Sequence, residues 1–161
     1  MPLYLEKICL DSTIIIAWMK NEARPNQEMG GVEYCIERIM KNEIKAIASV
    51  NIIGEILRGK YPPEVYDLFE RTTSKRRNFE LIGIDIRISK LIHEIRNYYD
   101  SLRIRRRIEL PDASHLATAI QYAVDAFYTF DKDLLSLNGN VAGHTLIICK
   151  PPLPRQRRLA F

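Results

Sequence analysis

Short apolar segments alternate along this chain with longer segments in which apolar residues recur at helical spacing. This alternation constrains the fold more than any other feature, because neighbouring parallel strands must be joined by a crossover that is usually a helix. The sequence therefore predicts an α/β fold, a three-layer sandwich whose mostly parallel five-stranded sheet is covered by helices on both faces. The expected strands span residues 7–10, 45–49, 79–85, 124–130 and 144–150.

The intervening segments predict helices, and several of their ends are marked by residue type. Ser12 or Thr13 can cap the first helix, Gly59 closes the third, and Pro111 opens the sixth. The expected helices span residues 12–20, 27–42, 50–59, 62–73, 86–107 and 110–123, with a helical turn over 131–137. Because no repeat or boundary interrupts this pattern, we expect one domain over residues 1–150, followed by a basic, extended or disordered tail over 151–161.

Composition excludes several classes of protein and mildly favours one kind of partner. Of the 161 residues, 47% are apolar, which is enough for a core, and the net charge of +4 favours an anionic partner, nucleic acid first. No segment approaches the ~18–20 unbroken apolar residues of a membrane span, and the N-terminus does not resemble a signal peptide. We therefore expect a cytoplasmic protein with no membrane association. Cys9, Cys35 and Cys149 are expected to be reduced thiols, and no histidine pair has zinc-ligand spacing.

Four acidic residues lie where a predicted strand passes into a helix, or near the start of one. Asp11 follows the first strand and is the only charge in the segment ICLDSTIIIAW, and Asp131 follows the fourth strand directly. Asp112 lies in the first turn of the helix that Pro111 opens, where the helix dipole favours an anion. Glu55 lies at the edge of the stripe that its helix is expected to bury. That stripe consists of Ile52, Ile53, Ile56 and Leu57.

Each of these acids also has a purely structural interpretation. Asp11 and Asp112 could cap helices, Asp131 could be a turn or cap residue, and Glu55 could be a solvated side chain. However, the carboxyl ends of parallel strands share one edge of the sheet, and sites gather outside it. Crowded carboxylates repel one another unless a cation lies among them, and hard oxygen ligands suit Mg²⁺ or Mn²⁺. Such ions can activate water and stabilise an in-line attack on a phosphodiester.

Four segments, taken in order, resemble the motifs of the PIN-domain ribonucleases, and most of all the toxin branch of the VapBC type. They are ICLDSTIIIAW, ASVNIIGEILRG, LPDASHLATAIQYA and FYTFDKDLLSL, and the resemblance runs over about residues 7–150. It implies a Rossmann-like fold and a metal-dependent endoribonuclease that uses Mg²⁺ or Mn²⁺, acts on RNA and pairs with a small antitoxin. Family members often form a homodimer. Two alternatives are a PIN nuclease that acts in RNA maturation and a PIN-fold module that binds RNA or protein without catalysis.

The resemblance also assigns roles to individual residues. Asp11, Glu55 and Asp112 match the three most regular acids of the family, and Asp131 matches the fourth, more variable one. Asp133 competes with Asp131 for that role and ranks second. The hydroxyls of Ser12 or Thr13, and of Thr129, are expected to orient carboxylates or water. His115 is expected to support the site or the fold rather than to bind metal.

A run of arginines before the Asp112 helix predicts a contact with the RNA backbone. Arg103, Arg106 and Arg107 share one face if the helix expected over residues 86–107 continues through them. Guanidinium groups bind phosphate in a bidentate manner, so this face could guide RNA toward the acids. The alternative is a solvated face with no function.

Overall fold

The computed structural model describes residues 5–74, 78–102 and 107–155. Its sheet has five strands in the order β3-β2-β1-β4-β5, and all neighbouring strands are parallel. The strands are β1 (Lys7–Leu10), β2 (Lys45–Ser49), β3 (Phe79–Ile82), β4 (Ala126–Tyr128) and β5 (Ile148–Cys149). The α/β class and the five-stranded parallel sheet predicted from the sequence are confirmed.

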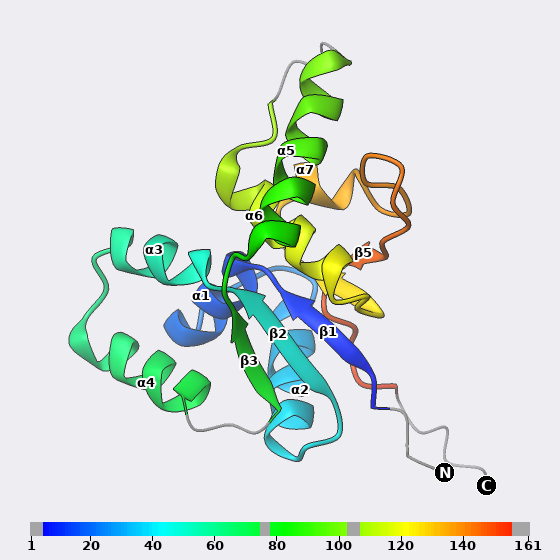
Figure 1. Ribbon diagram of the computed structural model, residues 1–161. Coiled ribbons are helices and arrows are strands. Elements are labelled where there is room, and N and C mark those ends of the chain that lie inside the picture. The colour runs from blue at the N-terminus through cyan, green and yellow to red at the C-terminus, as the bar shows by residue number, and fades with distance from the viewer. Residues whose placement is uncertain (1–4, 75–77, 103–106, 156–161) are drawn as a thin grey trace, which may run out of the picture.

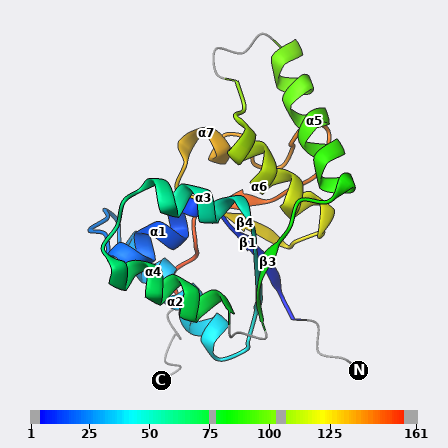
Figure 2. The same cartoon turned by 60° about the vertical axis from the view of Figure 1, so that its left-hand side comes forward.

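The described residues form seven helices that cover both faces of the sheet (Figures 1 and 2). They are α1 (Ser12–Lys20), α2 (Glu28–Met40), α3 (Asn51–Arg58), α4 (Pro63–Ser74), α5 (Ile86–Ser101), α6 (Leu110–Gln121) and α7 (Lys132–Leu135). Apolar residues of α1 to α4 pack on one face, and those of α5 to α7 pack on the other. The result is the expected sandwich of three layers.

Alternation along the strands explains why there are two cores. In β1, Ile8 and Leu10 contribute to the core beneath α1 and α2, whereas Cys9 contributes to the core beneath α5 and α6. Strand β2 repeats this pattern, with Ala46 on the first side and Ile47 on the second. A strand buried on both faces needs apolar residues at every position, which is why these segments are continuously apolar.

Three strands are shorter than the sequence predicts. Strand β3 ends at Ile82, because Asp85 already begins α5 and its Oδ1 accepts a hydrogen bond of 2.9 Å from the Ile88 amide. Strand β4 covers only residues 126–128. Strand β5 covers only residues 148–149, because the chain before it forms a turn in which Val141 and His144 exchange backbone hydrogen bonds.

The prediction of a long basic helix over residues 86–107 is wrong at the C-terminal end. Helix α5 ends at Ser101, and Arg107 lies in irregular backbone. Arg103 and Arg106 lie outside the described residues. Tyr99 is the last buried residue of the helix, and Leu102, which follows the helix, is half exposed.

Two further observations bear on the expectations drawn from composition. Among the described residues, no helix is long and apolar enough to cross a membrane. Cys9, Cys35 and Cys149 are free thiols, as expected, although Cys149 is only partly buried.

Candidate active site

The parallel strands bring two of the predicted acids to one edge of the sheet. Asp11 follows β1, the central strand, and Asp131 follows its neighbour β4. Glu55 lies on α3, which follows β2, and Asp112 lies in the first turn of α6. Strand β2 flanks β1 on its other side, so these acids surround the carboxyl end of the central strand.

Asp11 is a buried carboxylate held by two hydroxyl groups. Only 2% of its surface is exposed. Its Oδ2 accepts hydrogen bonds from Thr13 Oγ1 and Thr129 Oγ1, both at 2.7 Å. The Thr13 and Thr129 oxygens in turn accept bonds from the Phe130 and Asp131 amides, at 3.0 and 2.9 Å. This network fixes the orientation of Asp11 between β1 and β4.

The cap interpretation of Asp11 does not hold. Asp11 occupies the position before α1, but its side chain accepts no hydrogen bond from the amides of that helix. The carboxylate instead turns toward the hydroxyls of the neighbouring strand and helix. A buried charge that does not cap its helix requires another interpretation, and the surrounding groups supply one.

His115 on α6 lies between Asp11 and Glu55. Its Nε2 is 2.6 Å from Glu55 Oε2 and 3.9 Å from Asp11 Oδ1. Glu55 also accepts a hydrogen bond of 3.0 Å from Ser12 Oγ. Glu55 is therefore neither a solvated residue nor a core residue, and it faces the rim as its place on the helix predicted.

The electrostatics of this group favour an ion pair between His115 and Glu55. Burial lowers the pKa of His115, but the hydrogen bond that its Nε2 donates to Glu55 and the charges of Asp11, Glu55 and Asp112 outweigh burial, so the net pKa is raised. Burial raises the pKa of Glu55, but its contacts with His115, and then Ser12 and Arg58, hold it below the ordinary value. The His115 imidazole thus interacts electrostatically with three of the predicted acids.

His115 is fully buried, and among the described residues its Nδ1 has no hydrogen-bond partner. The sequence placed this residue in a supporting role, and the position of its ring at the centre of the group was missed. Its spacing from Asp112 places His115 on the same face of the helix, near the site, but its contact with Glu55 depends on the packing of α6 against α3.

Asp131 has the cap role that was one of its two interpretations. Its Oδ1 accepts hydrogen bonds from the Asp133 and Leu134 amides, at 2.8 and 3.2 Å, at the start of α7. It also borders the Asp11 network, because its own amide donates to Thr129. Asp133 is exposed on α7. Asp131 therefore remains the better candidate for the fourth acid.

Of the four apolar residues of α3 that were predicted to be buried, only two are buried. Ile52 and Ile56 are buried, but Ile53 and Leu57 are 36% and 62% exposed. The helix therefore rests on the core along a narrower stripe than expected. This places Glu55 at the boundary between the core and solvent.

A divalent cation fits this group in its chemistry, although the group is not arranged as a ligand set. Among the described residues, no three histidine, cysteine, aspartate or glutamate side chains are close enough together to hold one ion. Glu55 is engaged by His115 and Ser12, and the Asp131 carboxylate by the amides of α7. The donors are hard oxygens, as Mg²⁺ and Mn²⁺ prefer, and the buried Asp11 carboxylate lies 3.9 Å from the His115 imidazole.

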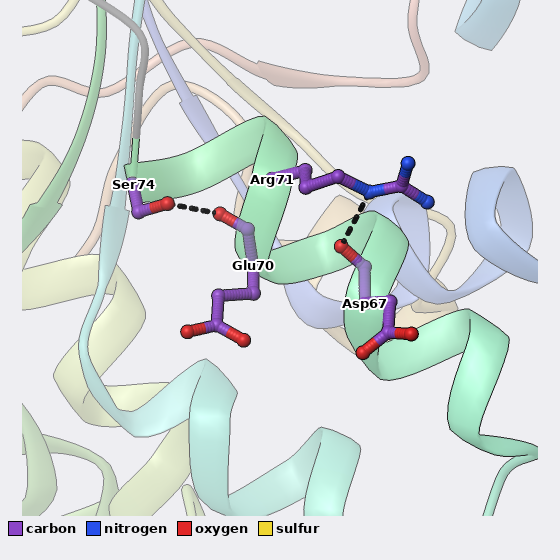
Figure 3. Close-up of a pocket in the computed structure, with 4 residues that line it drawn as sticks. All are labelled: Asp67, Glu70, Arg71 and Ser74. Atoms are coloured by element: carbon purple, nitrogen blue, oxygen red, sulfur yellow. Dashed lines mark hydrogen bonds between the residues drawn. The ribbon is translucent and has the colours of Figure 1, made fainter.

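Two hollows of the surface differ in their relation to this group. One of about 300 Å³ opens beside it and includes Thr13 and Asp131 in its lining. The other, of about 470 Å³, lies on the outside of α4 and is lined by Asp67, Glu70, Arg71 and Ser74 (Figure 3). There Arg71 and Ser74 donate to carbonyls of their own helix, so its polar groups do not converge on a ligand.

This chain belongs to the PIN domain family, whose model matches residues 8–140. No curated protein sequence matches it significantly. Its fold is similar to VapBC2 from Rickettsia felis, solved with a promoter DNA fragment, at 15% identity and a TM-score of 0.62 over 88% of this chain and 96% of that one. It is also similar to FitAcB from Neisseria gonorrhoeae, at 18% identity and a TM-score of 0.61 over 89% and 97%.

A third similar structure is VapC20 from Mycobacterium tuberculosis, described as a toxin that cleaves the sarcin-ricin loop. The identity is 14% and the TM-score 0.56, over 80% of this chain and 93% of that one. At such identities the likeness concerns the fold. The Rossmann-like PIN fold that the motifs implied is thus confirmed.

Proposed function

We propose that this protein is a metal-dependent endoribonuclease and the toxin of a toxin–antitoxin pair. One observation carries the proposal. A buried Asp11, at the carboxyl end of the central strand, shares one imidazole with Glu55 and Asp112 in a chain of the PIN family. A buried carboxylate with other acids grouped around it at a sheet edge is costly to the fold unless it serves a purpose there, and cation binding is the purpose that this chemistry fits.

In this proposal Asp11, Glu55, Asp112 and, as the fourth ligand, Asp131 hold a Mg²⁺ or Mn²⁺ ion through their oxygens. When bound, such a cation lowers the pKa of water and stabilises negative charge at a phosphodiester. RNA hydrolysis at this edge would leave a 5′-phosphate and a 3′-hydroxyl, as the family resemblance implies.

The chain's own residues hold the acids for this task. Thr13 and Thr129 orient Asp11, and Ser12 and His115 hold Glu55 at the rim. The raised pKa of His115 and the lowered pKa of Glu55 both favour an ion pair between these two side chains, which offsets part of the crowded negative charge. We further propose that Arg103, Arg106 and Arg107 contact the RNA backbone. Arg107 is well exposed, and its only ion pair in the described part of the chain is a loose one with Asp100, at 3.8 Å.

The assignment as a toxin is supported by the similar structures, which are described as VapBC and FitAB assemblies. The partner in this proposal is a small antitoxin protein that covers the rim, and the protein acts in the cytoplasm, with a homodimer as a further assembly. Its expression without an antitoxin should arrest the growth of a bacterial host. A variant with both Asp11→Asn and Asp112→Asn should not.

The test of the nuclease activity is cleavage of single-stranded RNA by the purified protein with Mn²⁺, with and without a chelator. We expect cleavage that the chelator abolishes and that the Asp11→Asn, Asp112→Asn double variant lacks while its circular dichroism stays native. The matched control is Asp67→Asn, the same change at an exposed position on α4, which should cleave like the wild type. Undiminished, chelator-sensitive cleavage by the folded double variant would rule out this site.

A further inference from the structure

The hollow beside the candidate active site has the features of a base-binding pocket. Its volume of about 300 Å³ lies at the lower end of the range for small-ligand pockets. It is lined by Thr13, Ile16, Glu22, Arg24, Phe130 and Asp131. Thr13 also donates to Asp11, so the pocket adjoins the proposed ligands directly. A nucleotide next to the reacting phosphodiester is therefore the part of an RNA that would reach it.

A guanidinium group stacked on an aromatic ring forms one wall of this pocket. The Arg24 guanidinium carbon lies 3.7 Å from the centroid of the Phe130 ring. Glu28 and Glu22 accept hydrogen bonds from Arg24 Nε and Nη1, at 3.0 and 3.1 Å. The Phe130 amide is bonded to Thr13. This planar pair is thus held in place from both sides, and flat guanidinium and aromatic groups are the surfaces on which unpaired bases stack.

The backbone also fixes the position of Glu22. Asn21 ends α1 in the left-handed conformation, with φ 48°, and the Glu22 amide bonds to the Ala17 carbonyl at 3.0 Å. The Glu22 carboxylate contacts Arg24 and, at 3.6 Å, Lys20. Its place beside the Arg24–Phe130 pair is therefore set by the end of a helix rather than by a free loop.

The charges of the lining decide which part of a nucleotide this pocket can bind. Within the lining, Glu22 and Asp131 are acidic and Arg24 is basic. Outside it, Lys20 pairs with Glu22 and Glu28 pairs with Arg24, so among these side chains the negative charges still outnumber the positive ones. A phosphate group would be repelled by such a lining. An uncharged base that presents N–H donors would be attracted to it.

We propose that this pocket binds a guanine base of the substrate RNA, next to the phosphodiester that is cleaved. This inference rests on the proposed function, since it names the base that the same site recognises. Guanine alone presents two adjacent donors, N1–H and N2–H, which a single carboxylate accepts together. Adenine and cytosine place a ring acceptor beside their amino group, and uracil places carbonyl oxygens on both sides of its N–H, so a carboxylate repels part of each edge.

The test measures RNA binding in the presence of a chelator, where no metal-dependent cleavage occurs. The probes are fluorescent uridine hexamers that contain either one guanosine or one adenosine, and binding is followed by anisotropy at fixed salt. We expect the wild type to bind the guanosine probe about tenfold more tightly, as one good bidentate contact allows. Glu22→Gln should lose this preference, because an amide presents a donor beside its acceptor, and Arg24→Ala should weaken both probes.

The matched control is Glu33→Gln, which makes the same change at an exposed position on α2. It should keep the tenfold preference. Equal affinity of the wild type for the two probes would overturn the inference, as would a preference that Glu22→Gln retains. A guanosine preference in a protein that never cleaves RNA would instead contradict the proposed nuclease and leave the pocket standing.

Discussion

Replacing Thr129 with valine removes one of the two hydroxyls that hold Asp11, with little change of shape. Thr129 has no exposed surface, and its Oγ1 donates to Asp11 Oδ2 and accepts from the Asp131 amide. A hydrogen bond to a charged group contributes about 1.5–3 kcal/mol, and a neutral one about 0.5–1.5 kcal/mol. The Thr129→Val change should therefore lower the free energy of unfolding by about 2–4 kcal/mol.

The measurement is urea denaturation in the presence of a chelator, with Thr118→Val as the matched control. Thr118 is equally buried, but its hydroxyl donates only to the Ser114 carbonyl of its own helix, so its loss should cost about 1 kcal/mol. In an Asp11→Asn background, where the partner is uncharged, Thr129→Val should cost at least about 1 kcal/mol less than in the wild type. Equal costs at the two threonines, or costs that do not depend on Asp11, would refute the proposed support of the buried carboxylate.

Three other results are expected. Mn²⁺ at a hundredfold excess over its dissociation constant should stabilise the wild type by about 2.7 kcal/mol in thermal melts, and the double variant with both aspartates changed should not respond. A hydrogen bond from Lys150 is the main cause that holds the pKa of Glu28 below 4.5. The ionised Glu28 therefore stabilises the folded protein fully above pH 4.5, and this stabilisation is lost as the pH falls through the lowered pKa. Glu28→Gln should accordingly flatten the acid limb of stability against pH in urea titrations. Changing Arg103, Arg106 and Arg107 together to glutamine should weaken RNA binding and reduce its log–log salt slope by about two units, and an unchanged slope would exclude them as phosphate contacts.

The order of strands and helices could be predicted from the sequence, because apolar periodicity is a local property. Strands β1 and β2 have the bounds that their apolar runs predict. The length of α5 could not be predicted in this way. The end of a helix depends on the surface that it packs against, and Tyr99, two residues before the end of α5, is its last buried side chain.

The acids at the rim could also be found from the sequence, since the ends of parallel strands meet at one edge. The central place of His115 could not be found in this way, because it depends on the tertiary packing that brings α6 close to α3. The stacking of Arg24 on Phe130 joins residues more than a hundred positions apart, and neither motif nor spacing indicates it. Contacts of this kind are set by tertiary packing.

The rate of RNA cleavage as a function of Mn²⁺ concentration tests the central claim most directly. Under single-turnover conditions, the account predicts a rate that rises to saturation for the wild type and for Asp67→Asn, and that stays near background at every concentration for Asp112→Asn. A folded Asp112→Asn variant that follows the wild-type curve, or wild-type cleavage that does not depend on Mn²⁺, would contradict the claim that these acids form a divalent-cation site.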